Sequence, residues 1–412
     1  YHANNLHTLM ENQLKVYILF LFLGIVACGG SDGGTDDNMI NQQEIEGPNS
    51  SSEPRLSADQ WSVVHFPKPA DEESSTYFGM DAGDVNGDGL VDIIQGNHYY
   101  LATAEEQTDW DIMKLEGSFD GHAIMFLGPE RGTGMVGISG SRVIQLLADL
   151  DDPDIMQATI VAQVPPPRNR EVARGCEKTQ IIAGGAEELL LTGREGIYML
   201  EADDMEEWSV SLIGPDAIAG QFATGDIDRD EDPDIVAAVS RGDVCELVWF
   251  ENPGDGSQYW NTHSLNHQMT GVKQIRLAHL DEDDRLDIVL AGSGMASENQ
   301  TGLQVYMQRD TGWMKTSELT SSSTLSLDIG DIDMDGDIDI ATLEGGQDEE
   351  LAFCIWNNDG KGDFQEERLE TTEGAPIRVH LFDVDVDGDL DFITLMNTEG
   401  HSVAVHVNRA IP

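Results

Sequence analysis

The sequence predicts an all-β protein, a seven-bladed β-propeller in which an N-terminal strand completes the last blade. Three observations lead to this prediction. An acidic nonapeptide recurs along the chain, short β-rich runs separate its copies, and one strand-like segment near the N-terminus belongs to none of the repeats. A motif that returns about every 50 residues is typical of repeat architectures. Closing such repeats into a ring removes exposed sheet edges.

The acidic nonapeptide occurs five times. Its copies are DVNGDGLVD at 84, DIDRDEDPD at 226, HLDEDDRLD at 279, DIDMDGDID at 331 and DVDVDGDLD at 383. The last three intervals are 53, 52 and 52 residues. Oxygen-bearing side chains alternate at positions 1, 3, 5 and 9 of most copies, the arrangement that wraps ligands around a hard cation.

Between the acidic loops the chain is predicted to form short strands. The unit that starts near residue 272 contains VKQIRLAHL, the loop, DIVLAGSG, GLQVYMQ and WMKTSEL, which are four β-rich runs separated by turn residues. Its third run has counterparts in ELVWFENPG at 246 and AFCIWNNDG at 352. The fourth run opens on an aromatic residue, Trp260, Trp313 or Phe364.

The 142-residue gap between the loops at 84 and 226 has room for two further units. We assign them to HAIMFLGPERGTGMVGISG from 122 and TQIIAGGAEELLLTG from 179, neither of which has the carboxylate ladder. The aspartates of LADLDDPDIMQ at 147 align instead with a turn between third and fourth strands. Seven units result, with loops near 84, 127, 184, 226, 279, 331 and 383.

The two ends of the repeat region favour a closed ring. The last unit runs through SVAVHVN and stops one strand short, while WSVVHF at 61–66 matches the aromatic-first fourth strand. An N-terminal strand that completes the C-terminal unit would close the ring. An open β-solenoid, the alternative, would not need this exchange.

The stretch FGMDAGDVNGDGLVDIIQG at 78–96, with its Phe78-Gly79 pair, resembles the FG-GAP/VCBS repeats of integrin α-subunit propellers and of secreted bacterial proteins. The resemblance extends over about residues 58–412. It implies a propeller with each metal loop between the first two strands of a blade. It implies little about function, because propellers host both binding and catalysis.

We expect the loops to hold calcium at about four to five sites with a mainly structural role, because Ca²⁺ takes six to eight oxygen ligands in flexible geometry. Acidic turns that bind no metal are the alternative. Leu90, Asp232, Arg285, Asp337 and Asp389 would contribute backbone carbonyls. The predicted side-chain ligands are Asp84, Asn86, Asp88, Asp92, Asp226, Asp228, Asp230, Asp234, Asp281, Asp283, Asp287, Asp331, Asp333, Asp335, Asp339, Asp383, Asp385, Asp387 and Asp391.

Two of the five loops depart from the pattern. In the loop at 226, Glu231 replaces the glycine expected at the sharp turn. In the loop at 279, His279 stands at the first ligand position, and imidazole suits transition metals better than calcium. We therefore expect the site at 279 to be the weakest of the five, or to use water at its first position.

Composition limits the partners of the chain. It has 22 basic and 77 acidic residues, a net charge of −55, and 40% hydrophobic residues, enough for a packed core. Such a charge excludes nucleic acid as a partner, because the phosphates would be repelled. Apart from Cys28, the three cysteines Cys176, Cys245 and Cys354 do not indicate a disulfide framework.

The N-terminal region predicts a bacterial lipoprotein. The apolar run 16–27 follows Lys15, is too short to span a membrane comfortably, and ends in Ile25-Val26-Ala27-Cys28, which resembles a lipobox. The resemblance implies a signal peptide over 1–27, with Met10 as a candidate start, and a lipid on Cys28. Residues 28–57 would be a flexible acidic linker and 58–412 the propeller. A secretory signal cleaved elsewhere is the alternative.

One segment is basic in an otherwise acidic chain. VPPPRNREVARGCEK at 164–178 carries Arg168, Arg170, Arg174 and Lys178, and it lengthens the link from the second unit to the third. It is a candidate binding site for an anionic glycan or a protein carboxylate. A solvated insertion is the alternative.

The sequence contains no nucleophile motif, phosphate loop or zinc spacing, so we do not expect an enzyme. The prediction is a monomeric outer-membrane lipoprotein, periplasmic or surface-exposed, that serves recognition or adhesion and meets the membrane only through its lipid. One alternative is a carbohydrate-active enzyme such as a polysaccharide lyase. Another is an envelope assembly or scaffolding lipoprotein.

Overall fold

The computed structural model divides the chain into two units, residues 1–55 and 56–412. The expected signal peptide, Cys28, the linker, Asn86 and Arg168, Arg170 and Arg174 lie outside the described residues. Within the described part, no helix is long and apolar enough to cross a membrane. The structure describes residues 61–67, 80–85, 88–96, 98–103, 110–114, 124–127, 134–148, 156–166, 175–182, 187–202, 208–241, 244–257, 259–269, 271–292, 302–320, 323–345, 351–369, 376–396 and 401–409.

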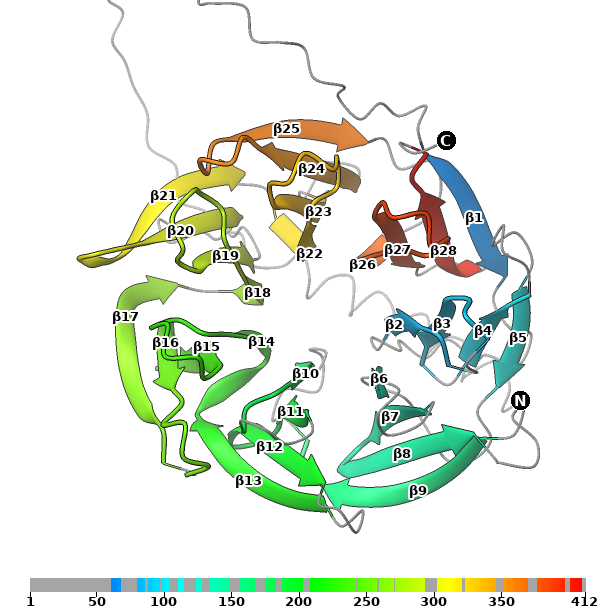
Figure 1. Cartoon of the computed structure of the whole chain (residues 1–412), viewed down its shortest axis with the longest axis horizontal. Coiled ribbons are helices and arrows are strands. Elements are labelled where there is room, and N and C mark those ends of the chain that lie inside the picture. The colour runs from blue at the N-terminus through cyan, green and yellow to red at the C-terminus, as the bar shows by residue number, and fades with distance from the viewer. Residues whose placement is uncertain are drawn as a thin grey trace, which may run out of the picture. The chain divides into compact units, whose positions relative to one another are not determined.

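The second unit is a ring of seven four-stranded antiparallel sheets, so the predicted seven-bladed propeller is confirmed. In Figure 1 the first strand of each blade lies nearest the centre and the fourth strand at the rim. Blades one to three are β2 (Met80–Gly83), β3 (Asp92–Gln95), β4 (His98–Ala102) and β5 (Trp110–Lys114); β6 (Ile124–Leu127), β7 (Gly134–Ser139), β8 (Arg142–Ala148) and β9 (Met156–Gln163); and β10 (Cys176–Thr179), β11 (Glu188–Thr192), β12 (Gly196–Ala202) and β13 (Trp208–Pro215).

The remaining four blades contain the last four copies of the acidic loop. They are β14 (Ala217–Gly225), β15 (Asp234–Ser240), β16 (Cys245–Glu251) and β17 (Asn261–Met269); β18 (Val272–Ala278), β19 (Asp287–Gly292), β20 (Leu303–Arg309) and β21 (Gly312–Thr320); β22 (Ser323–Gly330), β23 (Asp339–Gly345), β24 (Ala352–Asn358) and β25 (Phe364–Leu369); and β26 (Pro376–Phe382), β27 (Asp391–Met396), β28 (His401–Val407) and β1 (Ser62–Pro67).

The strand β1 completes the last blade, as predicted. Its sheet has the order β1-β28-β27-β26, and the register pairs Ser62 with Val407 and Phe66 with Val403. Phe66 also packs edge-on against Tyr100 and Trp110 of blade one, with both ring centroids 5.1 Å away. The N-terminal strand therefore ties blade seven to blade one and closes the ring, which Figure 1 shows beside the C-terminus.

The core lies between neighbouring blades. The second strands, such as β15 and β19, are apolar without alternation and almost entirely buried, because each packs against a blade on either side. The outermost strands, such as β25, bury far less of their surface. Leu190 and Ile197 of blade three meet Ile235 and Phe250 of blade four in one cluster. The repeated packing fixes the position of every loop.

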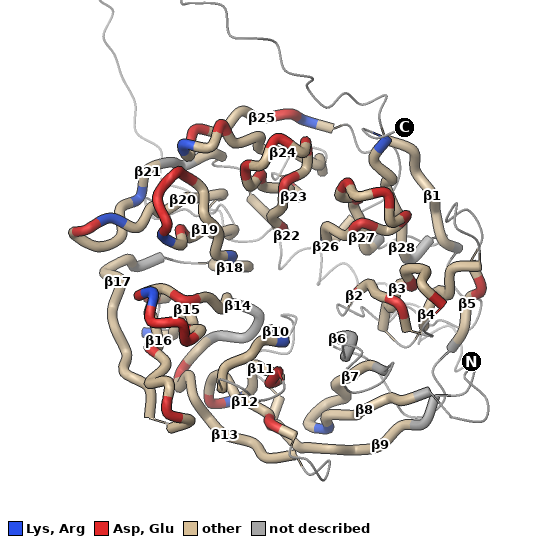
Figure 2. Tube along the Cα trace, in the orientation of Figure 1, with Lys and Arg blue, Asp and Glu red and all other residues tan. Residues whose placement is uncertain are grey.

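All five acidic loops connect the first and second strands of a blade. Because every blade repeats the same strand order, these turns open on the same face of the ring. Figure 2 shows their acidic residues in red along the ring. The aspartate-rich segment after residue 148 follows β8 and precedes β9, the third and fourth strands of blade two, so its predicted place between a third and a fourth strand is confirmed. Blade three begins at Cys176, slightly before the predicted start.

Candidate metal centres

The aspartate at position nine of each loop fastens the loop to its blade. In the loop at 331, one oxygen of Asp339 accepts a hydrogen bond from the amide of Ile332 at 3.0 Å and the other from the amide of Asn358 at 2.8 Å. The same pair of bonds, to the second loop residue and to the end of the third strand, recurs at Asp92, Asp234, Asp287 and Asp391. Each of these five side chains is at most 1% exposed.

Burial of these aspartates raises their pKa values strongly. The pKa of Asp339 and Asp391 is raised to about 7, chiefly because burial disfavours the charged form. At Asp92, Asp234 and Asp287 burial raises the pKa to about 6. The other carboxylates of each loop add repulsion. A bound cation would reverse this effect, because it stabilises the ionised form.

The loop backbone curls around the remaining carboxylates. In the loop at 383, Asp383 accepts hydrogen bonds from the amides of Asp387 and Gly388, both at 3.1 Å. Asp387 in turn accepts one from the amide of Asp389 at 3.1 Å. The sixth position has left-handed backbone, φ 100° at Gly388, which a residue without Cβ adopts without strain. These bonds hold the odd-numbered side chains toward one centre.

Three loops bring carboxylate oxygens close together. In each, one oxygen from each of three aspartates lies within 4.8 Å of the others. The groups are Asp226, Asp228 and Asp230; Asp331, Asp333 and Asp339; and Asp383, Asp385 and Asp391. All three are all-oxygen donor sets, which is the chemistry that calcium prefers.

Two of these groups contain an atom that lacks a partner. Asp331 Oδ1 and Asp385 Oδ1 are buried and accept no hydrogen bond, and the side chain of Asp385 is only 10% exposed. A buried oxygen without a partner costs free energy. Burial, with repulsion from Asp335 and Asp331, raises the pKa of Asp333 to about 6. A cation at the centre of each group would satisfy the oxygen and offset the repulsion, so these residues fit calcium.

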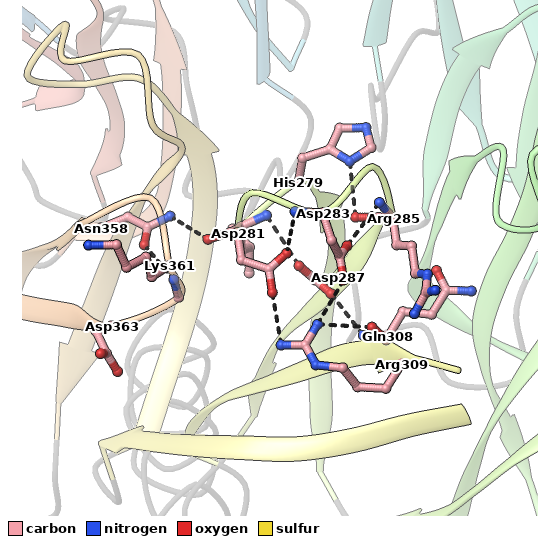
Figure 3. A network of polar contacts seen from close by, with 12 residues as sticks. His279, Asp281, Asp283, Arg285, Asp287, Gln308, Arg309, Asn358, Lys361 and Asp363 are labelled. Atoms are coloured by element: carbon pink, nitrogen blue, oxygen red, sulfur yellow. Dashed lines mark hydrogen bonds and ion pairs between the residues drawn. The ribbon is translucent and has the colours of Figure 1, made fainter. Parts of the chain in front are cut away.

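The loop at 279 is arranged differently (Figure 3). Arg309, at the end of β20, places one guanidinium nitrogen 2.8 Å from Asp281 Oδ2 and another 3.1 Å from Asp283 Oδ2. The ring of His279 points away from these carboxylates, and its Nδ1 lies 3.0 Å from the carbonyl oxygen of Arg285. Two predicted ligands, Asp281 and Asp283, therefore meet at an arginine that was not expected from the sequence, while Asp287 accepts backbone hydrogen bonds from Leu280 and Gln308.

A side-chain amide links each of four loops to a neighbouring blade. Asn358 Nδ2, at the end of β24 in blade six, donates to the carbonyl oxygen of Leu280 in the loop of blade five at 3.0 Å. Gln308 Nε2 in blade five donates to Ile227 of blade four at 3.2 Å. Asn252 and Asn408 occupy the same position in blades four and seven. This link was not expected from the sequence, although the four amides stand at equivalent positions near the end of the third strand.

Blade three keeps the fastening carboxylate without the ladder. Glu188 is 2% exposed, and its Oε2 accepts hydrogen bonds from the amides of Ile181 at 2.7 Å and Ile182 at 3.2 Å. Lys178, one of the predicted ligand-binding cations, lies in β10 and pairs with Glu187 at 3.0 Å. Blade three therefore lacks the carboxylate ladder, as predicted, but keeps a carboxylate at the position that anchors the turn.

A second polar network lies on the innermost strands. Asp328 of β22 accepts hydrogen bonds from Arg276 Nε of β18 at 3.1 Å and from His380 Nδ1 of β26 at 2.8 Å. His380 Nε2 also lies 3.8 Å from Asp81 of β2. Burial would raise the pKa of Asp328, but Arg276 and His380 outweigh it and hold that pKa well below its usual range. This network links blades five, six, seven and one.

Comparison with known families agrees with this geometry. Residues 331–394 match the model of the FG-GAP-like repeat. This segment is therefore similar to an FG-GAP-like repeat. The matched segment begins with the first aspartate of the loop at 331 and includes the whole loop at 383, the two loops with unpartnered buried oxygens. No curated protein matches the chain.

Solved structures with detectable similarity share little sequence with this chain. One is an Agrocybe aegerita lectin described as recognising non-reducing terminal N-acetylglucosamine, with 15% identity and a TM-score of 0.48 over 76% of this chain and 81% of that one. Another is AofleA from Arthrobotrys oligospora, with 12% identity and a TM-score of 0.41 over 72% and 87%. Similarity at this level does not bear on what the present chain binds.

Proposed function

We propose that this protein is a calcium-stabilised propeller of the bacterial cell envelope that recognises a protein or glycan partner and has no enzymatic activity of its own. The observation that carries the calcium part is the pair of buried, unpartnered oxygens, Asp331 Oδ1 and Asp385 Oδ1, inside converging carboxylates. The envelope location rests on the lipobox-like sequence that ends at Cys28.

The ions would act on the scaffold. In blade six, Asp331, Asp333 and Asp339 would hold the ion, with Asp335 and the carbonyl of Asp337 as further ligands in the same loop. Asp339 also fastens the start of the loop to the ends of β23 and β24. A cation there would neutralise carboxylates that otherwise repel one another, and so stabilise the turn and the two strands it joins.

Recognition would then belong to other loops of the ring. The metal oxygens face into their own turns, so they offer little to a partner. The basic segment 164–178 remains the candidate for an anionic glycan or a protein carboxylate, because it concentrates positive charge in a chain of net charge −55. Because it joins the fourth strand of blade two to the first strand of blade three, we expect this segment on the face opposite the acidic loops.

Calcium binding can be tested directly. Isothermal titration calorimetry of the chelator-treated protein should show calcium binding, and the Asp331→Asn/Asp333→Asn variant should lose one equivalent. The exposed Asp284→Ala variant is the matched control and should bind as the wild type does. If the wild type shows no heat of calcium binding, the calcium part of the proposal is overturned.

The recognition part needs a separate experiment. We expect a glycan array, combined with pull-down from envelope extract, to identify an anionic partner whose binding weakens in an Arg168→Ala/Arg170→Ala/Arg174→Ala variant. Equal binding by this variant would remove the basic segment from the proposal. Formation of unsaturated product from anionic polysaccharides would replace recognition with lyase activity.

A further inference from the structure

We propose that the guanidinium of Arg309 takes the place of a metal ion at the loop 279–287. Blade five would then bind no calcium in this loop. The inference concerns the same class of loop as the proposed calcium sites, and it rests on that proposal for its comparison with them. The ion pairs themselves are independent of that comparison.

The position of Arg309 is fixed from several sides. Its two terminal nitrogens contact different carboxylates, Asp281 and Asp283, and one of them also donates to the carbonyl oxygen of Gln308 at 3.0 Å. The backbone amide of Gln308, the residue before Arg309, donates a hydrogen bond to Asp287 at 2.8 Å. The side chains of Asp281 and Arg309 are 13% and 33% exposed, so this bridge is partly shielded from water. Arginine stays charged at all physiological pH values and suits such two-carboxylate contacts.

The carboxylates of this loop have no need of a further cation. His279 replaces the first aspartate, which leaves fewer negative side chains around the centre. Within the fully described loop 279–287, none of the carboxylate oxygens is buried without a partner, whereas the loops at 331 and 383 each contain such an oxygen. None of its aspartates belongs to a converging group of three. The geometry of this loop therefore does not fit an additional metal ion.

The equivalent position in neighbouring blades shows how specific this arrangement is. Blade six has Asp359 where blade five has Arg309, which adds a negative charge near its loop. Blade seven has Arg409, which contacts one loop carboxylate, Asp385, at 3.3 Å, and donates from Nε to Ser62 Oγ at 3.2 Å, with its side chain 50% exposed. Asp385 Oδ1 there remains without a partner. The contact in blade seven thus leaves the site incomplete, while that in blade five completes it.

The self-neutralised loop lies between two loops that we expect to hold calcium. Gln308 connects blade five to Ile227 in the loop of blade four, and Asn358 of blade six connects back to Leu280 in the loop of blade five. When calcium is removed, blade five would keep its turn ordered and remain bonded to both neighbours. It would act as a metal-independent anchor within the ring.

Calcium stoichiometry in the full chain provides the first test. By calorimetry, Asp281→Asn/Asp283→Asn should bind as many equivalents as the wild type, while Asp331→Asn/Asp333→Asn should bind one fewer. Loss of one equivalent from Asp281→Asn/Asp283→Asn would overturn the inference. If neither variant loses an equivalent, calcium binding at 331 fails, and the second test then decides the role of Arg309.

The second test needs no calcium. In EGTA, Arg309→Gln should lower the melting temperature by about 3 °C or more, because it leaves carboxylates without their cation. Arg409→Gln, at the equivalent position and in contact with a single loop carboxylate, is the matched control and should change the melting temperature by less. An unchanged melting temperature of Arg309→Gln in EGTA would overturn the inference. The His279→Asp/Arg309→Ser variant should gain one calcium equivalent. If this variant folds but gains none, the idea that Arg309 stands where the other loops hold calcium is contradicted.

Discussion

Blades three and six fasten their first turn in the same way but differ in the carboxylates that surround it. Both fasten the turn between their first two strands with a buried carboxylate, Glu188 in one and Asp339 in the other, and each carboxylate accepts two backbone hydrogen bonds. Only blade six adds further carboxylates that converge on one centre. The anchoring acid therefore occurs without the ladder, and the ladder in front of it is the part that we propose to hold a cation.

Of the changes that would separate the two blades, removal of calcium should have the largest effect on stability. A site saturated at 100 times its Kd contributes about 2.7 kcal/mol, so several sites together would dominate the stability of the ring. We expect EGTA to lower the melting temperature and to accelerate hydrogen exchange at the loops near 331 and 383, while the turn before Glu188 exchanges as before. Equal acceleration of hydrogen exchange in blades three and six would show that calcium does not act through the ladder of blade six alone.

Removal of the anchoring carboxylate should rank second. Asp339→Ala and Glu188→Ala each leave two amides without their acceptor, which costs about 1–3 kcal/mol for each buried group. Urea unfolding should show a similar loss for both variants, and calorimetry should show loss of a calcium equivalent for Asp339→Ala only. The exposed Asp284→Ala variant serves as control for both. A neutral Glu188→Ala variant would mean that blade three does not depend on its anchor.

The response to pH should have opposite signs with and without calcium. In the metal-free chain the folded pKa of Asp339 and Asp391 is about 7, above the unfolded value of about 3.9, so the folded state binds more protons. Stability in EGTA should therefore rise as the pH falls from 8 to about 5.5, and be lost as the pH rises through 7. With calcium the same change should lower stability, because ligands must be ionised to bind the metal.

Melting curves at pH 8 and 5.5, each in calcium and in EGTA, would measure this reversal. Relief of general repulsion in a chain of net charge −55 has the same sign as the effect expected in EGTA. The Asp339→Ala variant controls for this contribution, since it lacks one of the two groups and should show a smaller rise. A fall in stability between pH 8 and 5.5 in EGTA would contradict the expected titration.

The smallest effect should come from the sharp turn inside the loops. Glu231 has φ 76° where the loop at 331 has Gly336 at φ 99°. Glu231→Gly should stabilise the chain by about 0.5–1 kcal/mol by relieving left-handed strain, and Gly336→Ala should destabilise it by a similar amount. A Cβ added at Gly336 would meet no atom within 4 Å, so the substitution tests backbone conformation alone. Thermal melting would resolve both shifts, and equal signs would contradict the argument.

The fold could be read largely from the sequence because its signals are local and repeated. The five loop copies mark strand boundaries, and the unmatched segment at 61–66 indicates the closing strand. Glu188 could also have been found, since it opens the apolar second strand, where the five blades with the acidic nonapeptide have aspartate. Lys178, one of the predicted ligand-binding cations, lies in the strand β10 and pairs with Glu187, a partner that the sequence did not indicate.

Arg309 and the amides of Gln308 and Asn358 could not be assigned in the same way. Each acts on atoms that lie 26 to 81 residues away along the chain, and no local pattern records those partners. The Asp328 network likewise joins the innermost strands of several blades. Such contacts depend on how the blades are placed around the ring.

The sequence by itself determined the number of blades, the strand that closes them and the oxygen-rich character of five loops, because these follow from periodicity and residue chemistry. Only the tertiary structure decided which loops have carboxylates without a counter-charge. An arginine one strand away neutralises the loop at 279, while the loop at 331 faces another aspartate. Charge balance at a site depends on every group within a few ångströms, and folding alone brings those groups together.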